Sequence, residues 1–524
     1  MQHDPSRVDL TPHISGDGSP MRPNPETPPT TPLPHTSPPT SPPDISARLE
    51  FQRVQAELNS PEPNLGGFRR AILILGRVGT WAVFSPPRAG LRAWASLRPT
   101  QQLVIGFAAY VALGILALSL PWAQRSHVGF LDNLFTAVSA VSTTGLTTVA
   151  VSSSYTFFGQ LVILLLFQAG GIGFMTLSSV LIIARGRSLS ESRLGVLRAG
   201  FAVPRYFVMQ HFLVQVVTFT AIVQAVGAAI LWWRFSALGL PDAAWSAIFH
   251  SVSAFATAGF SLYPNSLEAL SADWVVNLTI AALCYLGAMG FIVVQDVWYS
   301  LKFRERMLTF TSKVILWMTA AIFILGTALV VILEPSIATL PLPERLLTAA
   351  FQVMSASTTA GFNSIPIGAM APSAIVVLLI AMLIGASPSG TGGGIKTTSL
   401  SAILGNIASV LRGRRTVVWL GHDIPLPRVL WAFAAASLYV MGVILGTLVL
   451  AASEDAPFLP LVFEAVSAIA TVGLSMGITS DLSILGKVTI IALMFVGRCG
   501  PLTIGLALLR PAEPEQPRPE DLAV

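Results

Sequence analysis

The sequence repeats one short motif four times, and the residues that end each copy are suited to binding a cation. Every copy starts with phenylalanine, carries a Ser-Ala pair and ends in a turn of the form Thr-x-Gly. Glycine permits positive φ, so successive main-chain carbonyls can point the same way. Rings of such carbonyls replace the hydration shell of K⁺ in selectivity filters. The copies are FTAVSAVSTTGL, FHSVSAFATAGF, FQVMSASTTAGF and FEAVSAIATVGL, at 135–146, 249–260, 351–362 and 463–474.

We expect the four turns to share one axis and to form an ion filter. Each apolar stretch before a turn is too short to cross a bilayer, which takes about 20 residues. Irregular backbone at that depth is tolerated only beside a watery path. The alternative is that the small residues merely allow close helix packing, but four copies in one register favour the filter. The predicted filter residues are Thr143, Thr144, Gly145, Thr257, Ala258, Gly259, Thr359, Ala360, Gly361, Thr471, Val472 and Gly473.

A glycine-rich stretch, GASPSGTGGGIKTT at 385–398, interrupts a later apolar run. Glycine costs a helix about 1 kcal/mol and proline about 3 kcal/mol, so the backbone should break here and face a cavity. We interpret the stretch as a flexible gate below the filter; a static kink filled by neighbouring helices is the alternative. A Walker motif is excluded, because Ile395 separates glycine from lysine. The predicted gate residues of the stretch are Gly385, Ser387, Gly390, Gly392, Gly393, Gly394 and Lys396.

Arg498 lies inside the last apolar run, in GRCGPLTIG at 497–505. A charge at this depth is costly unless it meets water or a partner. We place Arg498 in the cavity below the filter, facing the glycine-rich stretch, where it would raise the barrier to a cation and help to hold the gate. The alternative is that it reaches the cytoplasmic edge of the membrane. Lys396 has the same two interpretations.

The residue after each motif phenylalanine differs between the copies. Thr136, His250, Gln352 and Glu464 share this position. A position so variable in chemistry is a poor candidate for a shared ion site. Helix packing is the simpler interpretation.

The composition indicates a polytopic, all-α membrane protein. Of the 524 residues, 53% are hydrophobic and 11% charged. The two cysteines, Cys284 and Cys499, lie in apolar runs, where they act as small hydrophobes. The order span, motif, span recurs four times and predicts eight membrane crossings with four re-entrant helices. The expected spans are 103–122 and 158–184, 206–233 and 274–301, 314–333 and 373–411, and 429–452 and 485–509.

The chain divides by composition. Residues 1–65 form a Pro-rich tail without the apolar core of a signal peptide, and we expect disorder there. Residues 66–100 are basic and amphipathic, as in an interfacial segment; a short membrane span from Ala71 is the alternative. The repeats then occupy 101–200, 201–310, 311–415 with the intramembrane loop 385–398, and 416–524, which includes a C-terminal tail.

Basic residues gather in the loops on one side of the expected spans, which places those loops and both termini in the cytoplasm. All four motifs then enter the membrane from outside, where a filter that collects an external ion should open. Because the basic residues lie in short loops, the pI near 9.5 indicates contact with membrane lipid and not with nucleic acid. The basic side includes Arg69, Arg70, Arg77, Arg88, Arg92, Arg98, Arg185, Arg187, Arg193, Arg198, Arg205, Lys302, Arg304, Arg306, Lys313, Arg412, Arg414, Arg415 and Arg428.

These features together resemble the Ktr/Trk/HKT superfamily of potassium transporters, and most of all the membrane subunits of bacterial Ktr systems. The resemblance covers about 103–509. It implies four M1–P–M2 repeats, each a span, a pore helix and a second span, in pseudo-fourfold arrangement around one pore. It also implies K⁺ uptake across the bacterial cytoplasmic membrane, with Na⁺ bound more weakly. Certain plant HKT proteins carry serine at the first filter glycine and favour Na⁺, and Gly145 argues against that class.

The resemblance further implies partners. Proteins of this kind form a homodimer on a cytosolic KtrA-like ring that responds to ATP and ADP, and Na⁺ can act as an activator. The chain has no soluble nucleotide-binding domain of its own, and we expect no cofactor in it. A sodium-coupled secondary transporter for a cation or small solute is the alternative, but such folds typically use inverted repeats. An enzyme is disfavoured by the lack of paired carboxylates at membrane depth. The residues do not decide whether the protein works as a channel or as a coupled transporter.

Overall fold

The computed structural model describes residues 97–173, 176, 209–302 and 308–509. Within these residues the chain is helical, as expected, apart from one antiparallel hairpin of β1 (Val417–Trp419) and β2 (His422–Ile424). The expected tail 1–65, residues 66–96, the end of the span 158–184 and residues 510–524 lie outside the described residues. Many of the loop arginines lie there too.

Twelve helices fall into four sets of three along the chain. In each set a long helix comes first, a shorter helix that ends in the repeated motif comes second, and a third helix completes the set. The three helices of every set contact one another. The sets are α4 (Pro99–Leu118), α5 (Phe130–Val141) and α7 (Phe157–Ile172); α10 (Met209–Ala237), α11 (Ala243–Phe255) and α12 (Trp274–Ala288); α14 (Phe310–Leu333), α15 (Leu342–Ser357) and α16 (Pro372–Leu383); and α18 (Leu426–Ser453), α19 (Phe458–Ile469) and α20 (Ile484–Cys499).

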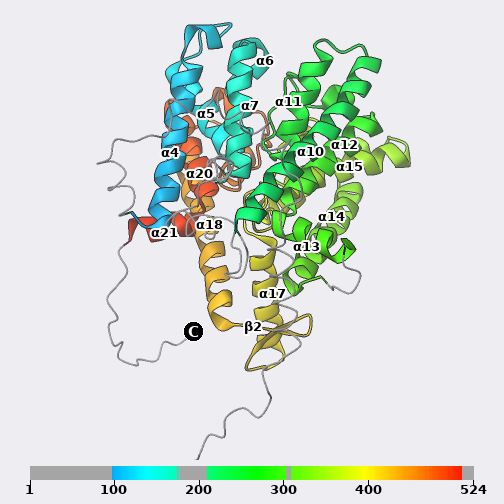
Figure 1. Cartoon of the computed structure of the whole chain (residues 1–524), viewed down its shortest axis with the longest axis vertical. Helices are drawn as coiled ribbons and strands as arrows, with labels where there is room; N and C mark the ends of the chain where they lie inside the picture. The colour runs from blue at the N-terminus through cyan, green and yellow to red at the C-terminus, as the bar shows by residue number, and fades with distance from the viewer. Residues whose placement is uncertain (1–96, 174–175, 177–208, 303–307, 510–524) are drawn as a thin grey trace, which may run out of the picture. The chain divides into compact units, whose positions relative to one another are not determined.

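Neighbouring sets meet in a cycle. The third helix of each set contacts the motif helix of the next, in the pairs α7 with α11, α12 with α15, and α16 with α19. The last helix, α20, returns to α5 in the first set. Figure 1 shows red α20 beside blue α4 and α5, although they stand at opposite ends of the described chain. An ion pair of 2.9 Å between Lys487 and Asp132 joins α20 to α5.

The first helices of the sets are the ones that suit a membrane most clearly. Among the described residues, α4, α14, α18 and residues 212–237 of α10 are long and apolar enough to cross one. Two bent pairs also qualify: α12 with α13 (Phe291–Lys302), bent by 97°, and α20 with α21 (Pro501–Leu508), bent by 88°. The spans expected over 274–301 and 485–509 are thus each divided into two helices with a sharp bend between them. The bends fall at Gly290 and Gly500, whose φ values of 92° and 84° end an α-helix.

The third set breaks where the sequence predicts. There α16 ends at Leu383, and α17 (Thr397–Leu411) begins after the glycine-rich stretch. The hairpin packs on α17, where the Ser409 hydroxyl accepts a hydrogen bond from the N–H of Val418 at 3.0 Å. The glycine-rich stretch is thus anchored between α16 of the third set and α17, as an interrupted span should be.

A glycine pattern that the sequence analysis missed fixes where three of the third helices meet the motif helices. In α7, α12 and α20 a glycine lies against the last turn of the motif helix of its own set. A Cβ at that glycine would stand 1.9–2.1 Å from a main-chain carbonyl oxygen, which is too close for any side chain. The pairs are Gly170 with Val141, Gly287 with Phe255, and Gly497 with Ile469.

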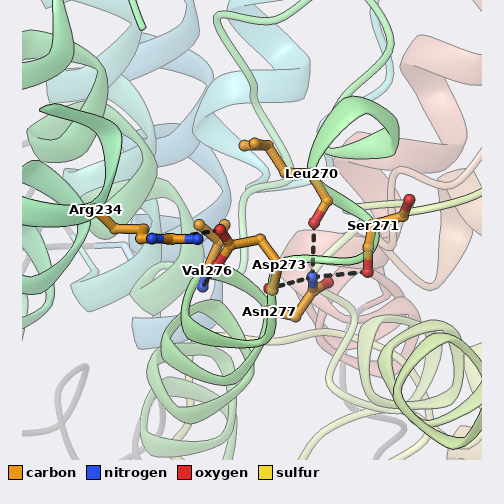
Figure 2. Close-up of polar contacts among 6 residues, drawn as sticks. All are labelled: Arg234, Leu270, Ser271, Asp273, Val276 and Asn277. Atoms are coloured by element: carbon orange, nitrogen blue, oxygen red, sulfur yellow. Dashed lines mark hydrogen bonds and ion pairs between the residues drawn. The ribbon is translucent and has the colours of Figure 1, made fainter. Parts of the chain in front are cut away.

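Polar side chains tie the helix ends of a set together. Asp273 caps α12 by accepting a hydrogen bond from the N–H of Val276 at 3.0 Å, and it pairs with Arg234 of α10 at 2.6 Å. Asn277 donates to three main-chain carbonyls just before it (Figure 2). These contacts join the end of α10 to the start of α12, the two helices that flank the motif helix α11.

Replacing Gly287 with alanine should destabilise the fold, because the new methyl group would collide with the carbonyl of Phe255. Overpacking of this kind costs about 1–3 kcal/mol, so the midpoint of thermal unfolding in detergent should fall. Gly505→Ala in α21 is the matched control, because a Cβ there meets no atom within 4 Å. Equal unfolding midpoints for the two variants would contradict the proposed close approach.

Candidate ion-conduction site

Each of the four motif helices ends in the same turn. Positive φ values of 68–96° occur at the four turn glycines, as the sequence predicts. The four turn threonines also have positive φ, at 50–57°, which the sequence did not indicate. In each turn, the residue between the threonine and the glycine donates its N–H to the carbonyl of the motif serine five positions earlier, at 2.8–2.9 Å. β-branched residues rarely adopt this conformation, so the surroundings must hold the threonines in it.

The four turns follow one another in a closed ring of main-chain contacts. A Cβ on Gly145 would lie 2.5 Å from the carbonyl oxygen of Ala258 in the second turn. Similar contacts lead from the second turn to the third and from the third to the fourth, at 2.8 and 2.3 Å. The ring closes where a Cβ on Gly473 would lie 2.0 Å from the oxygen of Thr144. All four predicted glycines are thus brought together, and no larger residue fits at any of them.

The motif serines brace the turns, a role that the sequence analysis missed. Ser139 and Ser467 each accept a hydrogen bond from the N–H of the turn glycine of their own copy, both at 3.0 Å. Ser253 instead donates to the carbonyl of Phe260, just past its turn, at 2.8 Å. The hydroxyl of Ser355 has no partner among the described residues. The serine was visible in the motif, but its direction toward the turn was not.

A cavity of about 280 Å³ opens directly against the ring. Its lining includes all four turn glycines, together with hydroxyl and amide side chains from the segments that follow the turns. Polar residues of this lining include Thr147, Ser261, Asn265, Asn363 and Ser475. Such a chamber can hold a hydrated cation at the entrance of the ring.

The variable position after the motif phenylalanine also faces these segments. His250 and Gln352 are buried, and their side chains hydrogen bond to the hydroxyls of Ser261 and Ser364 at 2.9 and 3.0 Å. Glu464 accepts a hydrogen bond from the hydroxyl of Ser475. The interpretation as simple helix packing is therefore incomplete, since three of the four residues fix the chain just beyond the turn.

The glycine-rich stretch lies against the other side of the ring, where it meets the turn threonines. The hydroxyls of Thr391 and Thr257 are 3.0 Å apart, and the N–H of Gly393 donates to Thr359 at 3.0 Å. A Cβ on Gly393 would also stand 2.2 Å from the hydroxyl oxygen of Thr471. Three of the four turns are thus contacted directly by this stretch.

Arg498 completes the set of contacts. Its guanidinium donates to the hydroxyl of Thr143 in the first turn at 2.8 Å and to the carbonyl of Thr391 in the glycine-rich stretch. It also donates to the carbonyls of Gly170 and Gly171 in α7. Arg498 therefore contacts both the first turn and the glycine-rich stretch. Four acceptors around one guanidinium compensate much of the cost of removing its charge from water.

Comparison with known proteins adds to this geometry. The chain matches the family model of TrkH, described as a cation transport protein, over residues 97–516. It is 35% identical over 421 residues to the Ktr system potassium uptake protein B of Bacillus subtilis, covering 78% of this chain and 93% of that protein. It is 33% identical over 424 residues to the potassium/sodium uptake protein NtpJ of Enterococcus hirae, covering 79% and 93%.

The chain belongs to the TrkH family of cation transport proteins. The resemblance drawn from the sequence is thereby confirmed. The crystal structure of the potassium transporter TrkH from Vibrio parahaemolyticus aligns with a TM-score of 0.62 over 78% of this chain and 84% of that one. At 18% identity this likeness concerns the fold alone.

The remaining predicted gate residues of this TrkH-family chain lie within the glycine-rich stretch. Lys396 turns inward, and its ammonium donates to the carbonyl of Gly392 at 2.6 Å rather than reaching outward. Gly385 packs on Gly394, where a Cβ would stand 2.7 Å from the opposing Cα. Ser387 makes a 3.1 Å hydrogen bond with Thr397 at the start of α17. Gly390 packs on the carbonyl of Ala288, which a Cβ would meet at 2.5 Å.

The described residues offer no alternative metal centre. No group of three His, Cys, Asp or Glu side chains that could hold a metal ion occurs among them. Cys284 and Cys499 are both buried and free. A cation at the ring would therefore rely on oxygen ligands from the main chain and from hydroxyls.

Ser467→Ala should loosen the fourth turn, because the N–H of Gly473 loses its acceptor. One hydrogen bond contributes about 1 kcal/mol, so the preference among alkali cations should weaken roughly fivefold. Competition between K⁺ and Na⁺ in a flux assay measures it. Ser355→Ala, at the equivalent serine without a partner, is the matched control and should keep the wild-type preference. A similar loss in both variants would contradict the bracing role.

Proposed function

We propose that this chain carries K⁺ into the cell through the ring of four Thr-x-Gly turns. The closed ring of main-chain contacts is the observation that carries the proposal, because four turns around one axis can supply the oxygens that a dehydrated K⁺ needs. The names of the relatives refer to potassium uptake, and in one case to potassium and sodium. K⁺ is thus the main cation and Na⁺ the weaker competitor. Turns this short should discriminate less sharply than the longer filters of potassium channels.

The four sets of helices act as M1–P–M2 units of a multi-pass protein in the bacterial cytoplasmic membrane. The motif helices are the re-entrant pore helices, and the cavity of about 280 Å³ is the external entrance. Exposed tryptophans near the ends of long helices, such as Trp122, Trp233 and Trp431, suit the two membrane interfaces. With both termini in the cytoplasm, an inside-negative potential drives uptake by about 2.3 kcal/mol per charge per 100 mV.

The glycine-rich stretch and Arg498 form the gate. Their contacts reach all four turn threonines, so a cation cannot leave the ring inward while these contacts persist. Arg498 also adds a positive charge on the path. Glycines 385, 390, 392, 393 and 394 let the stretch move without large side chains in the way. Opening requires the stretch to leave the threonines.

A second polypeptide regulates this gate. Two relatives are named as protein B of a Ktr system, which supports the existence of further subunits. A KtrA-like cytosolic ring that binds ATP or ADP, carrying a homodimer of this chain, fits the expectation from the sequence. Regulation through α17 is favoured, because α17 starts where the glycine-rich stretch ends.

Isotope flux into liposomes that hold the purified chain tests the proposed function. Uptake of ⁸⁶Rb⁺, competed more strongly by K⁺ than by Na⁺ and increased by an inside-negative potential, is the expected result. Gly473→Ala, which obstructs the ring, should abolish it. Uptake of an organic solute that depends on Na⁺, with no flux of Rb⁺ alone, would instead establish the alternative of a sodium-coupled transporter.

Arg498→Ala should raise the rate of Rb⁺ uptake severalfold, because it removes both a charge from the path and the link between Thr143 and the glycine-rich stretch. Initial rates in the same liposomes, corrected for the amount of protein, measure the effect. Arg428→Ala is the matched control, since this exposed arginine near the start of α18 lies away from the ring. Equal rates in wild type and Arg498→Ala would rule out a gating role for Arg498.

A further inference from the structure

One buried carboxylate beside the ring has no role in the mechanism so far. Glu464, on the motif helix α19, is fully buried. Its Oε1 atom accepts hydrogen bonds from the hydroxyls of Ser475 and Thr479, the latter at 3.0 Å. Its Oε2 atom has no hydrogen-bond partner among the described residues.

Glu464 has no counter-charge among the residues that the structure describes. The ion pairs among the described residues join Arg234 to Asp273 and Lys487 to Asp132, and neither includes Glu464. A buried charge is normally paired, because leaving it alone in a poorly polarisable interior is costly. The other acidic residues at helix ends, such as Glu454, are satisfied by main-chain N–H groups and hydroxyls. When it is ionised, Glu464 therefore needs a cation from outside the described residues.

The surroundings of Glu464 supply a place for that cation. Both hydroxyls that bind its carboxylate, those of Ser475 and Thr479, line the cavity of about 280 Å³ against the ring. Gly473 of the fourth turn lines the same cavity, and the hydroxyls of Ser475 and Thr479 lie between the cavity and the carboxylate. No acidic side chain is part of the described lining itself.

Only the fourth copy of the motif has a carboxylate at this position. The equivalent positions in the other three copies hold Thr136, His250 and Gln352. Gln352 is buried like Glu464, and its side-chain amide also makes a hydrogen bond with a hydroxyl beyond its turn, that of Ser364, at 3.0 Å. A neutral side chain thus suffices to brace the segment after a turn. Bracing alone does not explain a carboxylate at Glu464.

We propose that Glu464 sets the affinity of the entrance cavity for the transported cation, which acts as its counter-ion through the hydroxyls of Ser475 and Thr479. Glu464 does not touch the ion, so it is a positioning and electrostatic residue rather than a ligand. The inference rests on the proposed function, since it takes the cavity to be the entrance for K⁺. Its consequence is specific: removing the charge should weaken binding of the ion more than it slows transport of the bound ion.

The test compares Rb⁺ uptake by the full-length protein in liposomes over a range of Rb⁺ concentrations. Glu464→Gln keeps the shape and can keep the hydroxyl contacts, but removes the charge. Its KM should rise about three- to tenfold, the effect of one charge acting through partly screened protein, while the maximal rate changes less than twofold. Glu454→Gln is the matched control; it removes a charge from a carboxylate whose hydroxyl partner, Ser483, does not line the cavity, and its KM should stay at the wild-type value.

The reverse substitution keeps the inference testable if Glu464→Gln fails to fold. Gln352→Glu installs a second carboxylate at the equivalent position and should lower the KM by a similar factor. An unchanged KM in Gln352→Glu and in any folded Glu464→Gln would overturn the inference, and so would an equal rise in Glu454→Gln. Absence of Rb⁺ uptake by the wild type would instead reject the proposed function itself.

Discussion

The close approach of main-chain atoms in the ring of turns is the constraint on which the rest of the structure depends. At Gly145 and Gly473 even a methyl group would collide with the neighbouring turn. The turn threonines hold positive φ, a conformation that costs a non-glycine residue about 1–3 kcal/mol and persists only where the surroundings impose it. The motif serines, the buried phenylalanines and the tight glycine contacts of the third helices supply that support. The four motif helices are therefore held in one register.

The same main-chain oxygens that suit a cation also explain the contacts beneath the ring. Convergent carbonyls and hydroxyls repel one another unless a positive or hydrogen-donating group lies among them. Below the ring that group is Arg498, which binds Thr143 and the carbonyls of Gly170 and Thr391. Lys396 does the same within the glycine-rich stretch. In the proposed mechanism, a protein cation thus occupies oxygen atoms that a passing ion would otherwise meet, and moving it away would free them.

The sequence predicted the parts of this arrangement that local chemistry determines. Gly361 and its three equivalents were placed in turns because the motif repeats without gaps, and Arg498 was placed under them because an isolated charge in an apolar run needs a partner. The bend at Gly290 was not foreseen, because a glycine in an apolar helix serves close packing as readily as a bend. The link between His250 and Ser261 was missed for another reason. The partners at this position differ between copies, so the repeat concealed a shared geometry.

The departures from fourfold symmetry carry as much meaning as the symmetry. The turns must be alike, since each supplies one quarter of a ring, but a gate needs only one moving piece. The glycine-rich stretch occurs in the third set and the arginine in the fourth, where the first and second sets have Gly171 and Ala288. In the proposed mechanism, the three sets without the glycine-rich stretch would hold the ring rigid while the stretch moves. In the role proposed for it, Glu464 follows the same logic at the entrance, because a single charge beside the shared cavity avoids the mutual repulsion of four buried carboxylates.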